Sequence, residues 1–353
     1  MTSKPLARRK FVAISAAAAG LGLLPWNART SAASPLLIEW TGLWLGSVAS
    51  IRLYHQDRSA GEQLLRRALA EARRLETLFT LYRQDSLLCE LNRSSALAAP
   101  PAELVELLGI CDRAWSTTGG LFDPTVQPLW QCYLEHYSNS GPQPGPLPPE
   151  SLARALGNIG WRRVRFNRDR IVLEPGMALT LNGVAQGYMT DHVVELLRAG
   201  GLDSCLVDMG EIRSLGMKPD GMPWQIAIDG PTKWPLGAAE TLGKAVATSA
   251  ADGFAFTGDG QSNHLFNPIT GHCAAPGRTI TVVAPTAAEA DALSTAFAFP
   301  ATPAPRTLKP TIKAPPPLTN DLRENSRSIG LLRIPVTATS HPSPSQRRPS
   351  GSP

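Results

Sequence analysis

The sequence predicts an α+β fold, in which helices pack on sheets that are mixed but mostly antiparallel. Three observations support it. Residues 34–299, a stretch of 266, lie between two atypical ends and suffice for one large domain or two small ones. Segments with helical spacing and segments with strand character follow one another in mixed order. No short-period repeat is visible, and the mixed order of the elements disfavours a doubly wound parallel sheet.

The first half of this core predicts one strand and two helices. "SVASIRLYH" (47–55) has the character of a strand, and each helix that follows has one apolar face. The second helix ends at Gly119-Gly120, and the Pro/Gly-rich stretch 138–150 predicts a surface connection. The apolar faces consist of Leu65, Ala68, Ala72, Leu75 and Phe79 in the first helix, and Leu104, Leu107, Leu108, Cys111 and Trp115 in the second.

The second half predicts a hairpin, further strands and two helices. "RVRFNRDRIVLEP" (163–175) is typical of a hairpin, and "SCLVDM", "WQIAI" and "TITVV" are typical of strands. A helix is expected from Ala185 to the stop at Gly200-Gly201, and another after "TITVV".

The helix that begins at Ala185 has glycines in and just before its first turn, where side chains would be expected. Its apolar residues recur at helical spacing, whereas Asp191, Glu195 and Arg198 fall on the opposite side. Gly183 and Gly187 occupy the opening turn, although each glycine costs a helix about 1 kcal/mol relative to alanine. Some group is therefore expected to approach this helix end closely.

The last helix carries a candidate cation site. Thr286 and Glu289 form a capping box that predicts the helix start. Asp291 and Thr295 then stand four residues apart on one face, with Ser294 beside them. A carboxylate next to hydroxyl groups suits a hard cation, which prefers oxygen ligands. The alternative is an ordinary solvated helix, because Asp with Thr at this spacing is common.

Two further segments hold polar residues with alternative interpretations. His264 lies in the turn-rich loop "FTGDGQSNHLFNPITGHCA" (256–274), beside Phe266. A histidine in this setting is more often a packed structural residue than a catalyst. The dipeptide Asp123-Pro124 is typical of a turn.

The two ends of the chain differ from its core in charge. The sequence has pI 9.1 and a formal net charge of +5. Residues 1–33 hold five Lys/Arg and no acid, and residues 300–353 hold eight Lys/Arg and two acids, so the core keeps 21 basic against 27 acidic residues. No nucleic-acid partner is expected, because such binding needs basic residues on the folded surface.

Residues 1–33 have the features of a cleaved export signal. The pair Arg8-Arg9 precedes an apolar run (11–24), and small residues at 31–33 suit cleavage. The run is too short for a permanent bilayer span. The paired arginines indicate export by the twin-arginine (Tat) machinery, and hence a periplasmic location. An uncleaved amphipathic anchor is the alternative.

Six segments together resemble the ApbE family of FAD:protein FMN transferases over about residues 40–299. In order they are "LYRQDSLLCELN", "GGLFDPTVQPL", "LNGVAQGYMTD", "VATSAAD", "NHLFNPITG" and "VVAPTAAEADALST". The resemblance implies an α+β fold with FAD in a cleft and Mg2+ against its diphosphate. It also implies transfer of FMN onto a Thr or Ser of a target flavoprotein, with release of AMP. The export signal resembles that of the NosX-like branch tied to nitrous oxide reductase maturation, which implies a periplasmic target.

The resemblance also assigns site residues. The carbonyl of Gly183 would bind the metal together with Asp291 and Thr295, with Ser294 grouped beside them. Gly183 and Gly187 would then lack side chains so that the backbone, the cation and the diphosphate come into contact. His264 is the candidate base for the attacking hydroxyl. The FAD contacts carried over by motif are Leu45, Tyr82, Leu121, Phe122, Asp123, Thr180, Gln186 and Phe266.

The chain departs from the family pattern within the motifs and at the tail. Many relatives have Asp at the position of Thr180 and a charged residue at that of Gln186, so the adenosine side of the site carries less charge here. Residues 300–353 hold twelve of the 32 prolines and are predicted to be disordered. The sheet is then expected to lack an edge strand, and the last helix to end by Phe299.

Two other functions fit the same residues. A metal-dependent FAD pyrophosphatase would use water in place of the protein hydroxyl and release FMN and AMP. A non-catalytic FAD-binding maturation partner would keep the binding site without turnover.

Overall fold

The computed structural model describes residues 34–44, 47–139, 145–229, 235–241, 243–299 and 332–334. The chain divides into two compact units, Met1–Ser34 and Pro35–Pro353, and every element below belongs to the second. The predicted signal peptide and Leu45 lie outside the described residues. Within those residues, no helix has both the length and the apolar character that a bilayer span requires.

The main sheet has six strands in the order β1-β2-β6-β7-β10-β11, and every neighbouring pair is antiparallel. This confirms the predicted α+β class with a largely antiparallel sheet. The strands are β1 (Leu36–Trp44), β2 (Ser47–His55), β6 (Cys205–Asp208), β7 (Ile212–Leu215), β10 (Ala245–Ala250) and β11 (Thr279–Ala284).

Two smaller sheets of three strands accompany it, in the orders β12-β8-β9 and β3-β5-β4. The second contains the predicted hairpin. Their strands are β3 (Ala96–Ala98), β4 (Arg165–Phe166), β5 (Arg170–Val172), β8 (Gln225–Asp229), β9 (Pro235–Glu240) and β12 (Leu332–Ile334).

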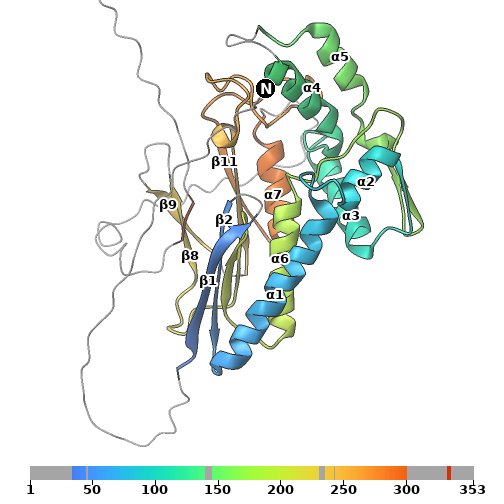
Figure 1. Cartoon of the computed structure of the whole chain (residues 1–353). Helices are drawn as coiled ribbons and strands as arrows, with labels where there is room; N and C mark the ends of the chain where they lie inside the picture. The colour runs from blue at the N-terminus through green and yellow to red at the C-terminus, as the bar shows by residue number, and fades with distance from the viewer. Residues whose placement is uncertain are drawn as a thin grey trace, which may run out of the picture. The chain divides into compact units, whose positions relative to one another are not determined.

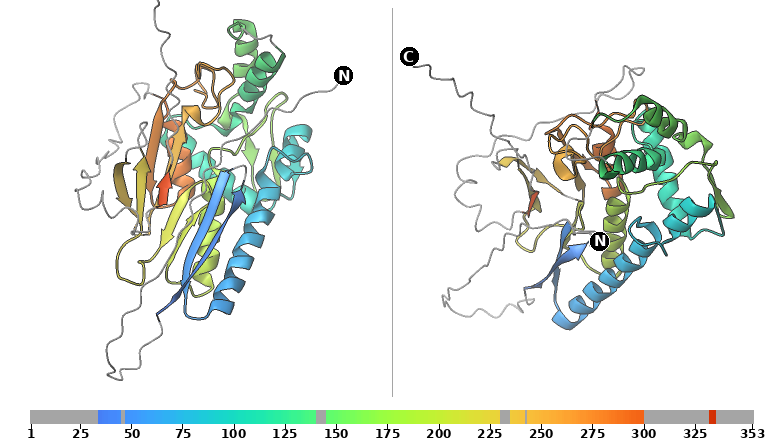
Figure 2. Two further views of the ribbon diagram at one scale, coloured as in Figure 1. Left: turned by 60° about the vertical axis from the view of Figure 1, so that its left-hand side comes forward. Right: turned by 45° about the horizontal axis from the view of Figure 1, so that its top comes forward.

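Three helices lie side by side along one face of the main sheet, with α6 between α1 and α7 (Figure 1). Figure 2 shows this helix layer against the sheet from two further directions. The helices are α1 (Arg58–Phe79), α2 (Leu87–Ser94), α3 (Ala102–Thr117), α4 (Gln127–Asn139), α5 (Pro149–Gly157), α6 (Ala185–Ala199) and α7 (Ala287–Ala296), with short 3-10 turns η1 (Pro124–Val126), η2 (Trp161–Arg163) and η3 (Ala251–Gly253).

Two apolar cores stabilise this arrangement. One lies between the sheet and helices α1 and α6, and contains Ile51, Leu65 and Val193. The other joins α1, α2, α3, α6 and α7, and contains Phe79, Leu108 and Tyr188. All five apolar residues predicted for the face of the first helix are buried.

The long periodic segments form the elements predicted for them. The strand 47–55, the helices with faces at 65–79 and 104–115, and the helix from Ala185 are all present. The last helix begins after Thr286, whose side chain accepts a hydrogen bond from the amide of Glu289 at 3.2 Å. This helix ends at Ala296, three residues before the predicted limit at Phe299.

One strand of the structure lies in the atypical tail. β12 pairs in parallel with β8, with Leu332 opposite Ile226. These three residues depart from the disorder predicted for 300–353, because an open strand edge offers backbone partners to any short extended segment. For the remainder of the tail, which lies outside the described residues, disorder stays a prediction.

Candidate active site

Hydrogen bonds bring three distant sequence motifs together just before α6. The side-chain amide of Asn92 donates to the carbonyl of Leu179 at 2.8 Å, and its oxygen accepts from the amide of Leu179 at 2.7 Å. The amide of Thr180 donates to the carbonyl of Pro124 at 2.8 Å. The segment that leads into α6 is thereby fixed between α2 and the loop that carries Phe122.

Gly183 lies where this segment meets α7. A Cβ atom added there would lie 3.0 Å from Oγ1 of Thr295 and 3.5 Å from the ring of Phe122. The structure therefore brings together Gly183 and Thr295, two of the predicted metal ligands, and the small residue permits the close approach.

Gly187 lies where α6 and α7 pack together. A Cβ atom added to it would lie 2.3 Å from the carbonyl oxygen of Ala287 and 2.6 Å from the amide nitrogen of Ala288. The start of α7 thus packs directly on the first turn of α6. Helix packing is therefore one reason for glycine at position 187, and its predicted role in making room for a cation and diphosphate stays a prediction.

Asp291 is the buried carboxylate of the site. Its side chain is 4% exposed, and the amide of Gly187 donates to it at 3.2 Å. Burial raises the pKa of Asp291 to about 7, the Gly187 amide opposes this shift, and the charge of Asp191 adds to it. Because little in the protein offsets the negative charge of this buried carboxylate, it is suited to bind a cation.

The hydroxyl groups of α7 face β10. Oγ of Ser294 is 2.7 Å from Oγ of Ser249 and also donates to the carbonyl of Asp291 at 3.0 Å. Oγ1 of Thr295 is 3.4 Å from the same Ser249 hydroxyl. The hydroxyl of Ser294 is thus occupied by protein partners. The hydroxyl of Thr295 lies near Ser249 and also near Gly183.

The donor set fits a hard cation. Asp291, Thr295 and the backbone at Gly183 offer only oxygen, which Mg2+ prefers. Across the described residues there is no group of three or more His, Cys, Asp and Glu side chains that could hold a metal. A cation at this place would therefore depend on carbonyl and hydroxyl oxygens in addition to carboxylate.

Glu211 lies close to Asp291, and the sequence patterns do not single it out. It occupies the turn between β6 and β7 and is 6% exposed. Burial raises the pKa of Glu211 well above its usual range, and the charges of Asp291 and Asp208 add to the shift. The one available signal was an acid directly after a glycine, between two short strands.

Gln186 faces the same turn. Gly210 has a φ of +103°, and a Cβ atom there would lie 2.7 Å from the amide nitrogen of Gln186. The half-buried Gln186 side chain therefore lies against the β6–β7 turn.

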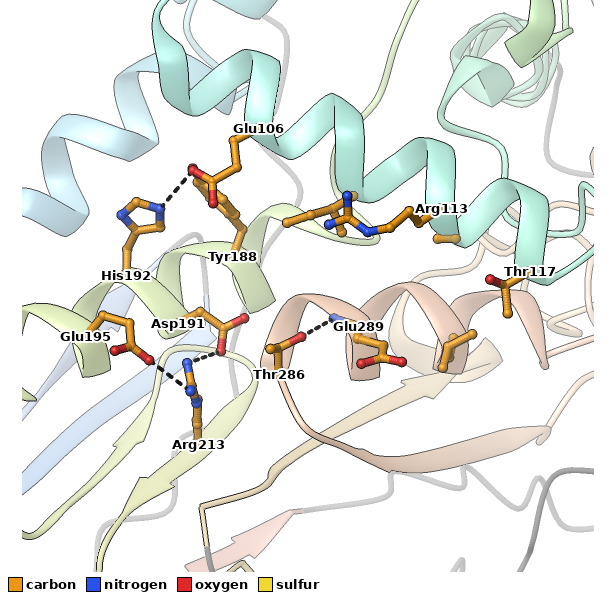
Figure 3. A pocket seen from close by; sticks show the side chains of 13 residues that line it. Glu106, Arg113, Thr117, Tyr188, Asp191, His192, Glu195, Arg213, Thr286 and Glu289 are labelled. Carbon is orange, nitrogen blue, oxygen red and sulfur yellow. Dashed lines mark hydrogen bonds and ion pairs between the residues drawn. The ribbon is translucent and has the colours of Figure 1, made fainter.

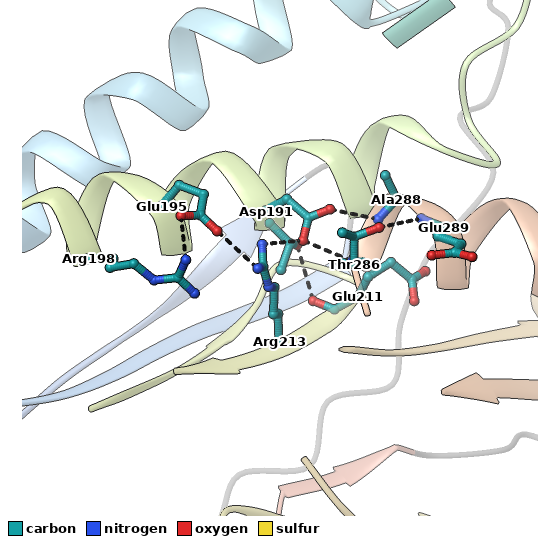
Figure 4. Close-up of polar contacts among 10 residues, drawn as sticks. Asp191, Glu195, Arg198, Glu211, Arg213, Thr286, Ala288 and Glu289 are labelled. Atoms are coloured by element: carbon teal, nitrogen blue, oxygen red, sulfur yellow. Dashed lines mark hydrogen bonds and ion pairs between the residues drawn. The ribbon is translucent and has the colours of Figure 1, made fainter. Parts of the chain in front are cut away.

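Asp191 caps the start of α7 (Figure 4). It accepts hydrogen bonds from the amides of Ala287 and Ala288 at 2.9 Å each, and from Arg213 at 2.8 Å. Arg213 also pairs with Glu195 at 2.9 Å. The sequence places Asp191 on the face opposite the apolar one, but the packing of α7 there largely buries it.

The residues predicted to contact the flavin range from buried to largely exposed. Leu121 and Phe122 are buried in the core, and Phe266 is buried with its ring 5.0 Å from that of Tyr133. Tyr82 is 73% exposed, and Thr180 is half-buried.

The carboxylate of Asp123 is engaged within the protein. It accepts from the amide of Thr125 at 2.8 Å and from that of Trp161 at 3.2 Å. Asp123 thereby caps η1, which confirms the turn interpretation of Asp123-Pro124. Burial raises the pKa of its carboxyl group, and these hydrogen bonds oppose the shift.

His264 follows the strand that carries Ser249. β10 runs into η3, and a Cβ atom at Gly253 would lie 3.2 Å from the imidazole ring of His264. Nδ1 is 3.1 Å from the carbonyl of Phe254, and a carbonyl can only accept. In the neutral ring Nδ1 is therefore protonated and Nε2 carries the lone pair. Burial lowers the pKa of His264, which favours this neutral form.

A separate cavity of about 640 Å3 lies between α3, α6 and α7 (Figure 3). It contains none of the predicted site residues. Three of its acids are already engaged, because Asp191 and Glu195 pair with Arg213, and Glu106 accepts from the hydroxyl of Tyr188 at 2.9 Å. We place the candidate site at Gly183, Asp291 and Thr295, where a buried acid has few protein donors.

Comparison with known proteins identifies the family of the chain. The model of the ApbE family matches residues 45–310. A FAD:protein FMN transferase of Treponema pallidum is 29% identical over 292 residues, which cover 72% of this chain and 76% of the relative.

Solved structures show the same fold. The flavinyl transferase ApbE of Pseudomonas stutzeri, in its apo form, has 27% sequence identity and a TM-score of 0.63, over 74% of this chain and 84% of that one. The ApbE protein of Thermotoga maritima has 25% identity and a TM-score of 0.65, over 74% and 86%.

Proposed function

The chain belongs to the ApbE family, and we propose that it is a FAD:protein FMN transferase, like the relatives it resembles. It would move the FMN half of FAD onto a Thr or Ser hydroxyl of a target flavoprotein and release AMP. The observation that carries this proposal is the meeting of Gly183, Asp291 and Thr295 at the start of α6.

The start of α6 suits the diphosphate of FAD. A helix N-terminus favours anions, because its first amides point outward and its dipole is positive there. The N-cap residue Val184 makes no side-chain hydrogen bond to this end of α6, and Asp291 from α7 accepts from one of its first amides, that of Gly187. The half-buried Gln186 and Thr180 lie close in sequence to this end and offer neutral hydrogen-bonding groups to the substrate.

Mg2+ is part of the proposal. The carbonyl of Gly183, the carboxylate of Asp291 and the hydroxyl of Thr295 would hold it. When bound, it would offset the negative charge of the diphosphate. The same residues position the α7 ridge against the start of α6, where the substrate is expected.

His264 is the proposed base. The target hydroxyl oxygen attacks the phosphorus of the FMN half, and the bond from that phosphorus to the bridging oxygen breaks. AMP leaves with the bridging oxygen and its electron pair. The proton of the hydroxyl passes to Nε2 of His264, which carries the lone pair while Nδ1 donates to Phe254.

The cellular setting is also a proposal. Arg8-Arg9 and the apolar run after them support export by the Tat machinery. The enzyme would then act in the periplasm on a periplasmic flavoprotein, and maturation of nitrous oxide reductase is the process we propose for it.

Incubation of the chain lacking residues 1–33 with FAD, Mg2+ and a periplasmic flavoprotein domain tests the function. Flavin fluorescence on the target band after denaturing electrophoresis would support FMN transfer. Release of FMN without labelled target would instead indicate an FAD pyrophosphatase. Bound FAD without either product would indicate a non-catalytic binding partner.

A further inference from the structure

Glu211 is held firmly by its backbone. Its carbonyl accepts from the hydroxyl of Thr190 on α6 at 3.2 Å and from the amide of Met209 at 3.1 Å. The turn that contains it is tightened by the bond from the amide of Gly210 to Asp208 at 3.1 Å. The side chain of Glu211 is therefore directed by the β6–β7 turn, and Figure 4 shows it reaching towards α7.

The carboxylate of Glu211 is incompletely paired. Oxygen Oε2 is shielded from solvent and has no hydrogen-bond partner among the described residues. Buried polar atoms are nearly always hydrogen-bonded, and an isolated buried charge is very costly. A buried carboxylate oxygen of this kind is therefore a candidate to bind a partner from outside the protein chain.

The charged neighbours of Glu211 make that partner a cation. Asp208 from its own turn and Asp291 from α7 both add negative charge around it. Arg213, two residues further on, is committed to Asp191 and Glu195 at 2.8 and 2.9 Å. Two buried carboxylates without an intervening positive charge repel each other, and a divalent cation would satisfy both.

We propose that Glu211 is a second carboxylate of the cation site, supplying an oxygen to the same Mg2+ as Asp291, directly or through a coordinated water. This inference rests on the proposed function, because it takes the cation from it. It goes beyond the ligands implied by the family motifs, which do not include the β6–β7 turn.

Metal binding without substrate tests the role of Glu211 independently of turnover. Mn2+ serves as a stand-in for Mg2+ whose free fraction is measured by electron paramagnetic resonance. Glu211→Gln should weaken Mn2+ binding at least tenfold, and Asp291→Asn should do the same. The matched control is Glu289→Gln, an exposed glutamate on α7, which should bind Mn2+ like the wild type.

The melting temperature of the metal-free proteins separates ligation from packing. Glu211→Gln should melt no lower than the wild type, because the amide removes an uncompensated buried charge. Weaker metal binding together with a clearly lower metal-free melting temperature would mark a packing role and overturn the inference.

The three variants also separate this inference from the proposed function. Wild-type affinity in Glu211→Gln beside weakened binding in Asp291→Asn would overturn the role of Glu211 and leave the cation site standing. Wild-type affinity in both variants would overturn the cation site itself.

Discussion

An aspartate side chain lies at the start of α7 and another at the start of α6, but the two carboxylates have very different surroundings. At the start of α7, Asp191 accepts from two backbone amides and from Arg213. At the start of α6, Asp291 accepts from the amide of Gly187 and has Glu211 nearby. The first carboxylate is paired with a positive charge of the protein, whereas the second is the one proposed to bind a cation.

This difference separates a structural acid from a functional one. A buried charge that the protein compensates contributes to the fold, because its removal leaves partners unsatisfied. A buried charge that the protein leaves uncompensated is costly, and such groups concentrate at binding and catalytic sites. The predictions below test whether Asp191 and Asp291 divide in this way.

Removal of the functional acid should have the largest effect. In Asp291→Ala we expect metal-dependent turnover to fall by about 100-fold or more, since loss of a supporting contact alone costs a metal site 10–100-fold. The fold should be kept, and FAD binding should largely survive. Turnover assayed over a range of Mg2+ concentrations measures the effect, and full activity would contradict the site assignment.

Removal of the structural acid should act on stability instead. In Asp191→Ala, Arg213 loses its buried partner and α7 loses its cap, which should lower the free energy of unfolding by about 3 kcal/mol. Urea unfolding measures this loss. Glu195→Ala is the control, because Glu195 is 48% exposed and such a partner contributes about 1 kcal/mol or less. Equal losses in both variants would refute the structural role of Asp191.

Gly187→Ala should disturb the contact between the two helices. Its Cβ atom would meet backbone atoms of Ala287 and Ala288, which cannot rotate away. We expect α7 to shift and the free energy of unfolding to fall by about 1–3 kcal/mol. A variant as stable as the wild type would show that the helices adjust without strain.

Gly183→Val should affect the ligand more than the fold. Its nearest neighbours are the side chains of Thr295 and Phe122, so the added atoms would occupy the space beside the proposed metal ligands. We expect FAD affinity to fall at least about tenfold, which corresponds to 1.4 kcal/mol, with a melting temperature close to that of the wild type. Fluorescence titration with FAD measures the affinity, and unchanged binding would remove Gly183 from the site.

The pH dependence of turnover should show the smallest effect. Burial lowers the pKa of folded His264 below its ordinary value of 6.5. Between these two pKa values the unfolded chain binds more protons, so the contribution of His264 to stability is complete above pH 6.5 and falls as pH drops below it. As the base, His264 should remain neutral at pH 6.5.

A profile of kcat/KM against pH, measured at saturating Mg2+ so that Asp291 stays ionised, should therefore lose activity only below pH 6.5, and His264→Gln should remove that acid limb. An acid limb above pH 6.5, or one that persists in His264→Gln, would assign the base elsewhere.

The sequence alone determined the longer helices and strands, and the kinds of side chain that form the candidate site. Helical spacing, strand alternation and the Thr286 cap are local properties, so they predicted α1, α3, α6, α7 and the strands β2, β6, β8 and β11. The ordered motifs predicted the family and paired Asp291 with Thr295 on one ridge. Short elements such as α2, β7 and β10 escaped prediction, because their stability comes from packing against neighbours.

Only the tertiary structure decided which acids are compensated. Asp191 looks solvated in the sequence, yet the start of α7 and Arg213 enclose it, and Glu211 looks like a turn residue, yet it lies buried near Asp291. The need for glycine at position 187 likewise depends on Ala287, a hundred residues away in the chain. Burial and charge compensation arise between segments distant in sequence, and local patterns cannot contain them.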